Sequence, residues 1–275
     1  LGADAGDAAA PPAPLAPLGF SFSVGGMLFT YQLGVGNALR DMGYIVPGST
    51  PLSGSSAGSL VAAILALDLD TEAVLERLAA VRADCRARGT AGRLALLLRE
   101  HMLPVLPEDA PARLRPGLLS VPYYRLLPVP RPVVCTQFTS RTDLMDVLLA
   151  SCCWPFFLQR APAVRCRGAL AVDGFFVAPG TLGALYPTPG AERTVLVSAF
   201  PRFASATLNA TVPRCNLIDP AIDGAFPGPP DGLAAWVSSA LYADDDARTE
   251  ELYELGRRHA ALWAREHAPE APRRA

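Results

Sequence analysis

A serine between two glycines, Gly54-Ser55-Ser56-Ala57-Gly58, stands where strand-like sequence gives way to helix-like sequence. A serine at the apex of a sharp strand-to-helix turn needs glycine on both sides, since the backbone passes too close to neighbouring chain for side chains. The pattern therefore indicates Ser56 as a nucleophile, with Gly54 and Gly58 permitting the turn. A tight turn or a helix N-cap has the same composition, so the surroundings of the motif decide between the interpretations.

The serine motif is the second of two strand-turn-helix units near the start of the chain. In the first unit, Gly19 to Ser23 alternates phenylalanine with serine, as a strand does, and runs through Gly25-Gly26 into a helical pattern over Met27 to Met42. In the second, Pro51 to Ser55 is strand-like and Ala57 to Leu67 continues as an alanine-rich, apolar helix.

Strands and helices continue to alternate along the rest of the chain. Thr71 to Arg88 is amphipathic, with Thr71 as the predicted N-cap and Gly89 as the residue that ends the helix. The other expected helices are Gly92 to Leu103, Thr142 to Ala150, Trp236 to Leu241 and Asp246 to His267, and the other expected strands are Leu118 to Leu127, Pro132 to Gln137, Ala169 to Val172 and Thr194 to Ser198. This alternation predicts an α/β fold, a three-layer sandwich with a mainly parallel sheet covered by helices on both faces.

Length and composition fit a chain with a large core. The 275 residues include 51% hydrophobic side chains, and we expect one domain over residues 19–275, with its motif-bearing part at 19–179 and a helical C-terminal part at 232–267. The net charge of -2 provides no field of one sign, which argues against nucleic acid as a partner. The six cysteines have neither the spacing of a zinc site nor the density of a disulfide scaffold, so we expect reduced thiols in an intracellular compartment.

The opening stretch, residues 1–18, is rich in alanine and proline and contains no basic residue. It fits neither a secretory signal nor a transit peptide, and its composition predicts a flexible leader. Because the chain begins with Leu1 and not with methionine, we expect a fragment or a processed product whose targeting signal is missing. No stretch reaches the roughly 18 apolar residues of a membrane-spanning helix, so the predicted location is cytoplasmic or organellar.

Asp173-Gly174 is the third feature with chemical meaning, after Gly25-Gly26 and the serine motif. A serine hydroxyl is a poor nucleophile until a base takes its proton, and the oxyanion that forms on the attacked carbonyl needs preorganised N–H donors. Glycines at the start of a helix supply such donors, and Asp173 is a candidate base. Asp-Gly alone is a common turn dipeptide, but the joint occurrence of the three features favours catalysis.

Together these motifs resemble those of the patatin-like phospholipases, over roughly Gly19 to Pro179. The resemblance implies a Ser-Asp dyad instead of a histidine-containing triad, with Ser56 as nucleophile and Asp173 as general base. It also implies an oxyanion hole framed by Gly25, Gly26 and Met27, and motif glycines at Gly54, Gly58 and Gly174. The run Ala150-Ser151-Cys152-Cys153-Trp154-Pro155-Phe156-Phe157 looks like the segment that ends a helix before the family's aspartate.

Three positions depart from the family's pattern. Val24 stands where the glycine-rich segment usually opens with another glycine, Phe29 replaces a frequent glycine beyond it, and Phe175 follows Asp-Gly in place of glycine or alanine. The two glycines that would supply oxyanion donors are kept. The bulky phenylalanines leave the shape of the pocket, and hence the substrate, open.

The resemblance implies a lipase or phospholipase that cleaves fatty-acyl esters of phospholipid, galactolipid or triacylglycerol through an acyl-enzyme intermediate. This chemistry needs no metal and no organic cofactor. The expected partners are a lipid ester substrate and, through peripheral contact, a membrane or lipid-droplet surface. Leucines of the Gly92 to Leu103 helix are expected in the core, or at a lipid surface if exposed beside the pocket: Leu96, Leu97, Leu98 and Leu103, with Met102.

Two alternatives remain open at this stage. Phe29 and Phe175 are compatible with a catalytically inactive, lipid-binding relative. A Ser-Asp-His triad of the α/β-hydrolase type is the other, since His259 and His267 follow Asp173 in the chain. The early position of the serine argues against that fold, and the charged helix around both histidines predicts a solvated helix face for them.

Overall fold

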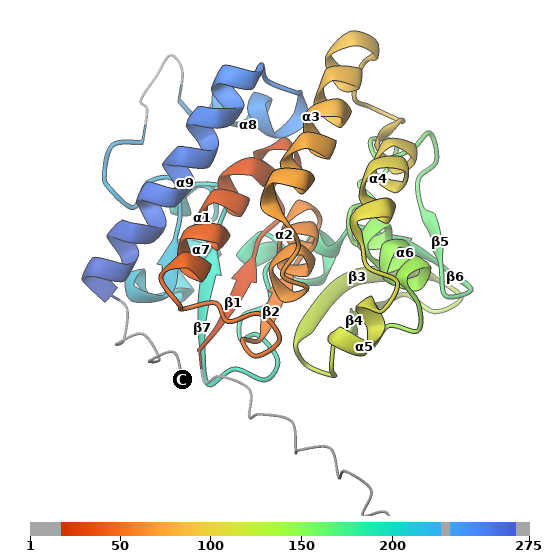
Figure 1. The fold of residues 1–275 in the computed structure, drawn as a ribbon, viewed down its shortest axis with the longest axis horizontal. Helices are drawn as coiled ribbons and strands as arrows, with labels where there is room; N and C mark the ends of the chain where they lie inside the picture. The colour runs from red at the N-terminus through yellow and green to blue at the C-terminus, as the bar shows by residue number, and fades with distance from the viewer. Residues whose placement is uncertain (1–17, 227–231, 268–275) are drawn as a thin grey trace, which may run out of the picture.

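The computed structural model describes residues 18–226 and 232–267, which form an eight-stranded sheet surrounded by helices (Figure 1). The strands are β1 (Leu18–Phe22), β2 (Leu52–Gly54), β3 (Leu119–Leu127), β4 (Arg131–Cys135), β5 (Val164–Cys166), β6 (Ala169–Val172), β7 (Arg193–Val197) and β8 (Leu217–Ile218). Their order is β5-β6-β3-β2-β1-β7-β8, and β4 pairs with β3. The run from β3 to β8 is parallel, whereas β4, β5 and β6 are antiparallel additions at one edge. The prediction of a mainly parallel sheet is thus confirmed for the part that carries β1 and β2.

Helices connect most of the strands. They are α1 (Phe29–Asp41), α2 (Ala57–Ala66), α3 (Thr71–Arg88), α4 (Leu94–Met102), α5 (Ala110–Arg113), α6 (Arg141–Ser151), α7 (Ala206–Thr211), α8 (Leu233–Leu241) and α9 (Asp246–His267). Short 3-10 helices lie at η1 (Gly26–Leu28), η2 (Leu103–Val105), η3 (Gly174–Val177), η4 (Pro179–Thr181), η5 (Arg202–Ala204) and η6 (Arg214–Asn216).

Both faces of the sheet are covered, as predicted for three layers. Phe20 of β1 and Val197 of β7 are fully buried in the main core, which also contains side chains of α1, α2 and α9. Leu196, which points to the opposite face because side chains alternate along a strand, belongs to a second buried cluster with Leu208 of α7. The helices of the main core and α7 therefore sandwich the sheet.

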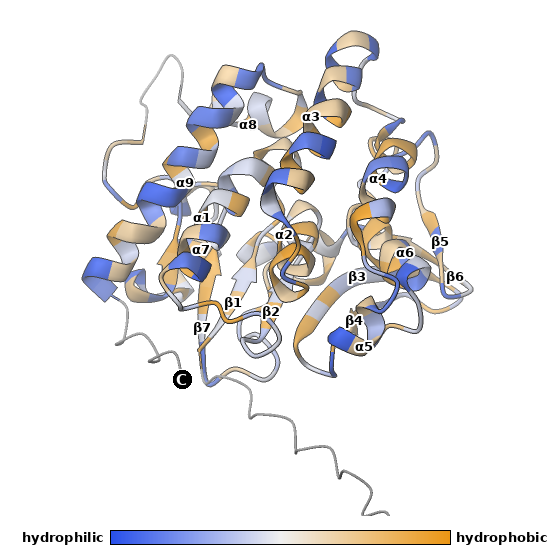
Figure 2. Cartoon of the chain, viewed as in Figure 1, coloured by the Kyte–Doolittle hydropathy of each residue, from blue (hydrophilic) through white to orange (hydrophobic). Residues whose placement is uncertain are grey.

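The composition of each helix follows its environment (Figure 2). Every residue of α2 is buried, and the helix is apolar all round. α9 alternates charged and apolar side chains, and Trp263 on its buried side packs edge-on against Phe20, with ring centroids 6.1 Å apart. α9 is thereby held on the core by one face and solvated on the other.

Some predicted boundaries and environments were wrong. Asp70, not Thr71, caps α3, because its carboxylate accepts the N–H groups of Glu72 and Ala73. The short elements β5, β8 and α7 were not anticipated.

The leucines of α4 differ in their environment. Leu97 is in the core, 5% exposed, while Leu96 is 70% exposed. Only the second of these neighbours has the exposure that a lipid contact needs. Residues 1–17 of the predicted leader lie outside the described ranges.

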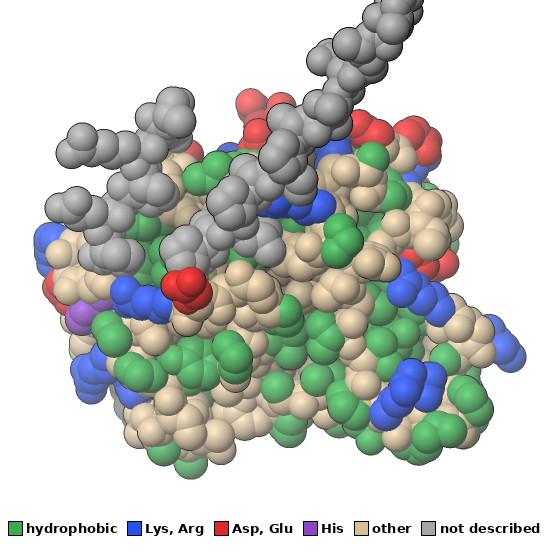
Figure 3. Space-filling model, turned by 90° about the horizontal axis from the view of Figure 1, so that it is seen from below, with side chains coloured by type: hydrophobic (Ala, Val, Ile, Leu, Met, Phe, Trp, Pro, Cys, Tyr) green, Lys and Arg blue, Asp and Glu red, His purple; other side chains and the backbone are tan. Residues whose placement is uncertain are grey.

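The surface fits the small net charge. Acidic and basic side chains are interspersed with hydrophobic ones on the face seen in Figure 3, so no large field of one sign is visible on its described atoms. Among the helices of the described residues, none combines the length and apolar character required to cross a bilayer.

Candidate active site

Ser56 lies on the sharp turn between β2 and α2. Its backbone has φ 54° and ψ -130°, a conformation that residues with a side chain rarely adopt. The flanking glycines are required by space: a Cβ on Gly54 would lie 2.1 Å from the carbonyl oxygen of Gly58, and one on Gly58 would lie 2.4 Å from that of Ser23. The turn is therefore the sharp strand-to-helix turn that the motif predicted.

Hydroxyl groups hold this turn from several sides. The N–H of Ser56 donates to Ser151 Oγ at the end of α6, at 3.0 Å. Ser59 Oγ donates to the carbonyl oxygen of Ser56, at 2.7 Å, and Ser55 Oγ donates to that of Gly183, at 2.5 Å. Sequence reasoning assigned no role to Ser151 or Gly183, because their contact with the turn depends on the tertiary fold.

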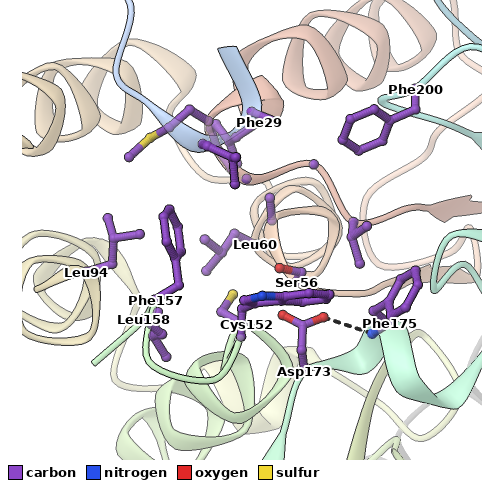
Figure 4. Close-up of a pocket in the computed structure, with 18 of the residues that line it drawn as sticks. Phe29, Ser56, Leu60, Leu94, Cys152, Phe157, Leu158, Asp173, Phe175 and Phe200 are labelled. Carbon is purple, nitrogen blue, oxygen red and sulfur yellow. Dashed lines mark hydrogen bonds between the residues drawn. The ribbon is translucent and has the colours of Figure 1, made fainter. Parts of the chain in front are cut away.

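Asp173 follows β6 and is 1% exposed. Burial raises the pKa of its carboxyl to about 7, and hydrogen bonds from the N–H of Phe175 and from Ser56 partly offset that effect. The Phe175 N–H lies 2.8 Å from Asp173 Oδ1, and Figure 4 shows the carboxylate facing the Ser56 hydroxyl. A carboxyl group with this pKa is divided between its ionised and neutral forms near pH 7, as a general base and acid has to be.

The glycine-rich segment lies at the same pocket. Gly25, Gly26 and Met27 all line it. Gly26 has φ 55°, and a Cβ there would lie 2.1 Å from the carbonyl oxygen of Ala240, so only glycine fits. Within the described ranges, the N–H groups of Gly25 and Gly26 have no protein acceptor. They are thus free to donate to a ligand.

The pocket has a volume of about 460 Å³ and is mostly apolar, a size typical of sites for small molecules and lipid chains. In Figure 4, Ser56 lies between two flanks, one formed by Phe175 and Phe200 and the other by Leu94, Phe157 and Leu158. Phe29 and Phe175, the departures from the family's pattern, line the pocket without filling it.

Cys152 also lines the pocket and carries a nucleophilic side chain. Burial raises the pKa of its thiol well above the ordinary range, and the nearby Asp173 carboxylate adds to the effect. A thiol in this environment stays protonated at neutral pH and is a poor nucleophile. Ser56 therefore remains the better candidate.

The histidines His259 and His267 do not lie beside Ser56 and Asp173 in the pocket. His259 is 2% exposed, so the prediction of a solvated face is wrong for this residue. Its Nδ1 lies 3.0 Å from Tyr31 Oη and its Nε2 lies 3.3 Å from Asp223 Oδ2. His267 ends α9, and neither histidine is among the described residues that line the pocket. A Ser-Asp-His triad is not assembled in this arrangement.

Fold and site define a class: a three-layer α/β protein in which a serine on a sharp turn and a buried aspartate face one apolar pocket. Comparison with known proteins identifies the family. The sequence model of the patatin-like phospholipases matches residues 20–186, and the chain belongs to this family.

The curated relatives are considerably longer than this chain. It is 30% identical over 169 residues to human omega-hydroxyceramide transacylase, a match that covers 59% of this chain and 31% of that protein. The mouse protein of the same name is 28% identical over 169 residues, covering 59% of this chain and 28% of its own length. Among solved structures, VipD from Legionella pneumophila superposes with a TM-score of 0.44 and 13% identity, over 94% of this chain and 68% of that one.

Proposed function

We propose that the protein is a lipid acyl-ester hydrolase or acyltransferase that works through Ser56 and Asp173. One observation carries the proposal: the Ser56 hydroxyl faces a buried carboxyl whose pKa burial raises to about 7, inside an apolar pocket of about 460 Å³. The family membership supports acyl-ester chemistry as the reaction class. An apolar pocket fits a fatty-acyl chain better than a polar substrate.

In the proposed first step, ionised Asp173 takes the hydroxyl proton of Ser56 as the serine oxygen bonds to the acyl carbonyl carbon. The carbonyl oxygen becomes an oxyanion, which accepts hydrogen bonds from the free N–H groups of Gly25 and Gly26, with Met27 beside them. When the oxyanion collapses, the ester bond breaks and the departing alcohol takes the proton from Asp173. The acyl group is then esterified to Ser56 and Asp173 is ionised again.

In the second step, a hydroxyl compound attacks the acyl-serine while Asp173 takes its proton and passes it to Ser56 Oγ. Water yields a free fatty acid, and a lipid alcohol yields a new ester. Transfer has support from two observations. The pocket wall is mostly apolar, which disfavours water, and the curated relatives are named omega-hydroxyceramide transacylases. The apolar side chains on both flanks of Ser56 suit an acyl chain on one side and a second apolar group on the other.

The test is labelling of the whole chain with a fluorophosphonate, together with hydrolysis of a short-chain p-nitrophenyl ester. Wild type is expected to be labelled at Ser56 and to turn over the ester, and Ser56→Ala to lose both. Asp219→Asn is the matched control for Asp173→Asn, because Asp219 is also buried with a raised pKa but does not line the pocket. An unlabelled wild type would instead indicate a catalytically inactive, lipid-binding relative.

We also propose that the pocket opens toward a lipid surface. Exposed apolar side chains gather beside it, and Trp154 stacks on Phe176 with ring centroids 5.4 Å apart. We call this group the rim: Trp154, Phe156, Phe176, Leu233, Val237 and Leu241. An exposed apolar patch of this kind marks an interaction site, and aromatic residues favour the membrane interface.

A vesicle-binding assay tests the rim. Phe156 is 64% exposed and does not line the pocket, so Phe156→Asn is expected to weaken binding to phospholipid vesicles while turnover of a soluble ester persists. Asparagine suits the positive φ of 63° at this position. Val129→Ser is the control, since Val129 is 58% exposed but stands apart from the rim in the turn after β3. Equal effects of the two substitutions would contradict the proposal.

A further inference from the structure

Arg82 is an unusual component of the pocket wall. It lies on α3, which also contributes Leu78 and Val81 to the wall, and it is half-buried. Among the described residues that line the pocket, Arg82 and Asp173 are the only charged ones. Arg82 has no part in the proposed acyl transfer, so the presence of a charged side chain in an apolar wall needs a separate explanation.

The guanidinium of Arg82 has no protein partner within the described ranges. Its Nε is buried without a hydrogen-bond acceptor, and the side chain forms no ion pair. Two charged groups act on it: Asp246, which attracts it, and Arg86, which repels it. Asp246 is already occupied, because Arg86 Nη1 donates to its Oδ1 at 3.3 Å and to the carbonyl oxygen of Asp244 at 2.8 Å.

Nε and the two Nη groups of Arg82 lie in different surroundings. Nε is buried without an acceptor, whereas the Nη groups are not among the buried unpaired atoms, as on other long side chains that keep their polar end in water. Burial lowers the pKa of Arg82, which reflects the cost of holding the charge there. A buried donor of a charged group without an acceptor is costly to a fold. An anion in the pocket would remove that cost.

We infer that Arg82 binds an anionic oxygen group, a phosphate or a carboxylate, on the lipid that occupies the pocket beside Ser56. The identity of the occupant as a lipid rests on the proposed function. The planar guanidinium presents paired N–H donors that match the oxygens of phosphate and carboxylate. Bound in this way, the anionic group fixes one end of the lipid at α3, and the protein prefers anionic over neutral lipids.

Calorimetric titration with three ligands of one chain length tests the inference without requiring turnover. Octyl phosphate, octanoate and 1-octanol differ only in the polar end. Wild type is expected to bind at least one of the two anions about tenfold or more tightly than the alcohol. Arg82→Gln is expected to abolish this preference, and Arg82→Lys to keep part of it. Arg86→Gln, one helical turn further along α3, is the matched control and is expected to keep the preference in full.

The outcomes separate the sources of the anion. A preference confined to octyl phosphate supports a phosphate-bearing lipid, and one confined to octanoate supports a fatty-acid carboxylate. Equal affinity of wild type for all three ligands overturns the inference even if Arg82→Gln fails to fold, and so does an undiminished preference in a folded Arg82→Gln. Because none of the ligands is an ester, a failure of the Ser56 chemistry would leave these results unchanged, and the two proposals fail separately.

Discussion

The turn that carries Ser56 and the turn that carries Asp173 position their side chains at different energetic costs. Ser56 has a positive φ of 54°, and a strained backbone of this kind costs about 1–3 kcal/mol. Asp173 has ordinary dihedrals, φ -44° and ψ 146°, but its carboxyl is removed from water. The cost of the first turn is backbone strain, and the cost of the second is the desolvation of a carboxyl group. Both costs concentrate where the two side chains meet.

The two turns are also packed directly against each other. A Cβ on Gly174, next to Asp173, would lie 2.6 Å from the carbonyl oxygen of Pro122, 2.8 Å from Ser55 Oγ and 2.9 Å from Ser151 Oγ. Ser151 Oγ is the acceptor of the Ser56 N–H. The position of the serine therefore depends on the absence of a side chain at Gly174, which makes the two turns one structural unit.

Removing the carboxylate gives the largest expected effect on turnover. Asp173→Asn should lower turnover of a soluble ester by about 10²- to 10⁴-fold, the range for loss of a general base. In wild type, turnover should rise with pH through about 7, because the ionised form of Asp173 is the base. A pH profile that is flat between pH 5 and 9 would contradict this role, as would an equal loss in Asp219→Asn.

The same substitution should change stability in the opposite direction. The folded pKa of Asp173, about 7, lies above the ordinary value of 3.8, so the fold favours the neutral carboxyl. Its contribution to stability is complete below pH 4 and is lost as pH rises through 7, by roughly 4 kcal/mol at most. Asp173→Asn avoids this loss and should melt above wild type at pH 8, with a smaller difference at pH 5. Thermal melts at the two pH values measure it.

Gly174→Ala tests the contact between the turns. The added methyl would have to displace Ser55, Ser151 and the backbone carbonyl of Pro122 in β3. A shift of about 1 Å in a reacting group can cost about 10²-fold in rate. Turnover should therefore fall strongly while Ser56 and Asp173 are both present. Gly168→Ala, in the turn between β5 and β6, is the control, because it has open space but a positive φ of 75°. It should lose about 1 kcal/mol of stability and keep its turnover.

The parts of the fold that could be predicted from sequence are those whose periodic pattern spans a whole buried element. The sequence of α2 is apolar because every one of its residues is buried, and α3 buries Val74, Leu78, Val81 and Cys85, which recur at helical spacing. β8 has two residues and β5 has three, too few for any period to be detectable. Their existence depends on pairing with β7 and β6 and not on local sequence.

The site divides in the same way. Ser56 could be proposed because a sharp turn imposes glycines within two residues of it, whereas Asp173 has no local mark beyond a common dipeptide and was proposed only because it occurs together with the other two motifs. Ser151 could not be assigned, because its bond to Ser56 joins residues far apart in the chain. His259 was misjudged, because the charged residues around it hid the fact that it points at α1.

Ser151→Ala should have a moderate effect. Without Oγ, the Ser56 N–H loses its acceptor, which should cost about 1 kcal/mol of stability and a few-fold in turnover as the turn loosens. Ser151→Thr, which keeps a hydroxyl, should restore turnover. Ser140→Ala is the control at the other end of α6, since Ser140 Oγ only caps that helix by accepting the Asp143 N–H at 2.9 Å. A loss of turnover in the control equal to that of Ser151→Ala would show a general effect of α6 stability.

His259→Gln should have the smallest effect on turnover, and the difference from Asp173→Asn separates a dyad from a triad. Burial lowers the pKa of His259, and Asp223 partly offsets the effect, so the fold favours the neutral ring. The contribution of the neutral ring to folding stability is complete above pH 6.5, the ordinary pKa of histidine, and is lost as the pH falls through the lower pKa of the folded state. Replacing the ring removes the contacts with Tyr31 and Asp223, so stability at pH 8 should fall by about 1–3 kcal/mol. Turnover by the folded variant should match wild type, and a loss of 10²-fold or more would restore the histidine to the mechanism.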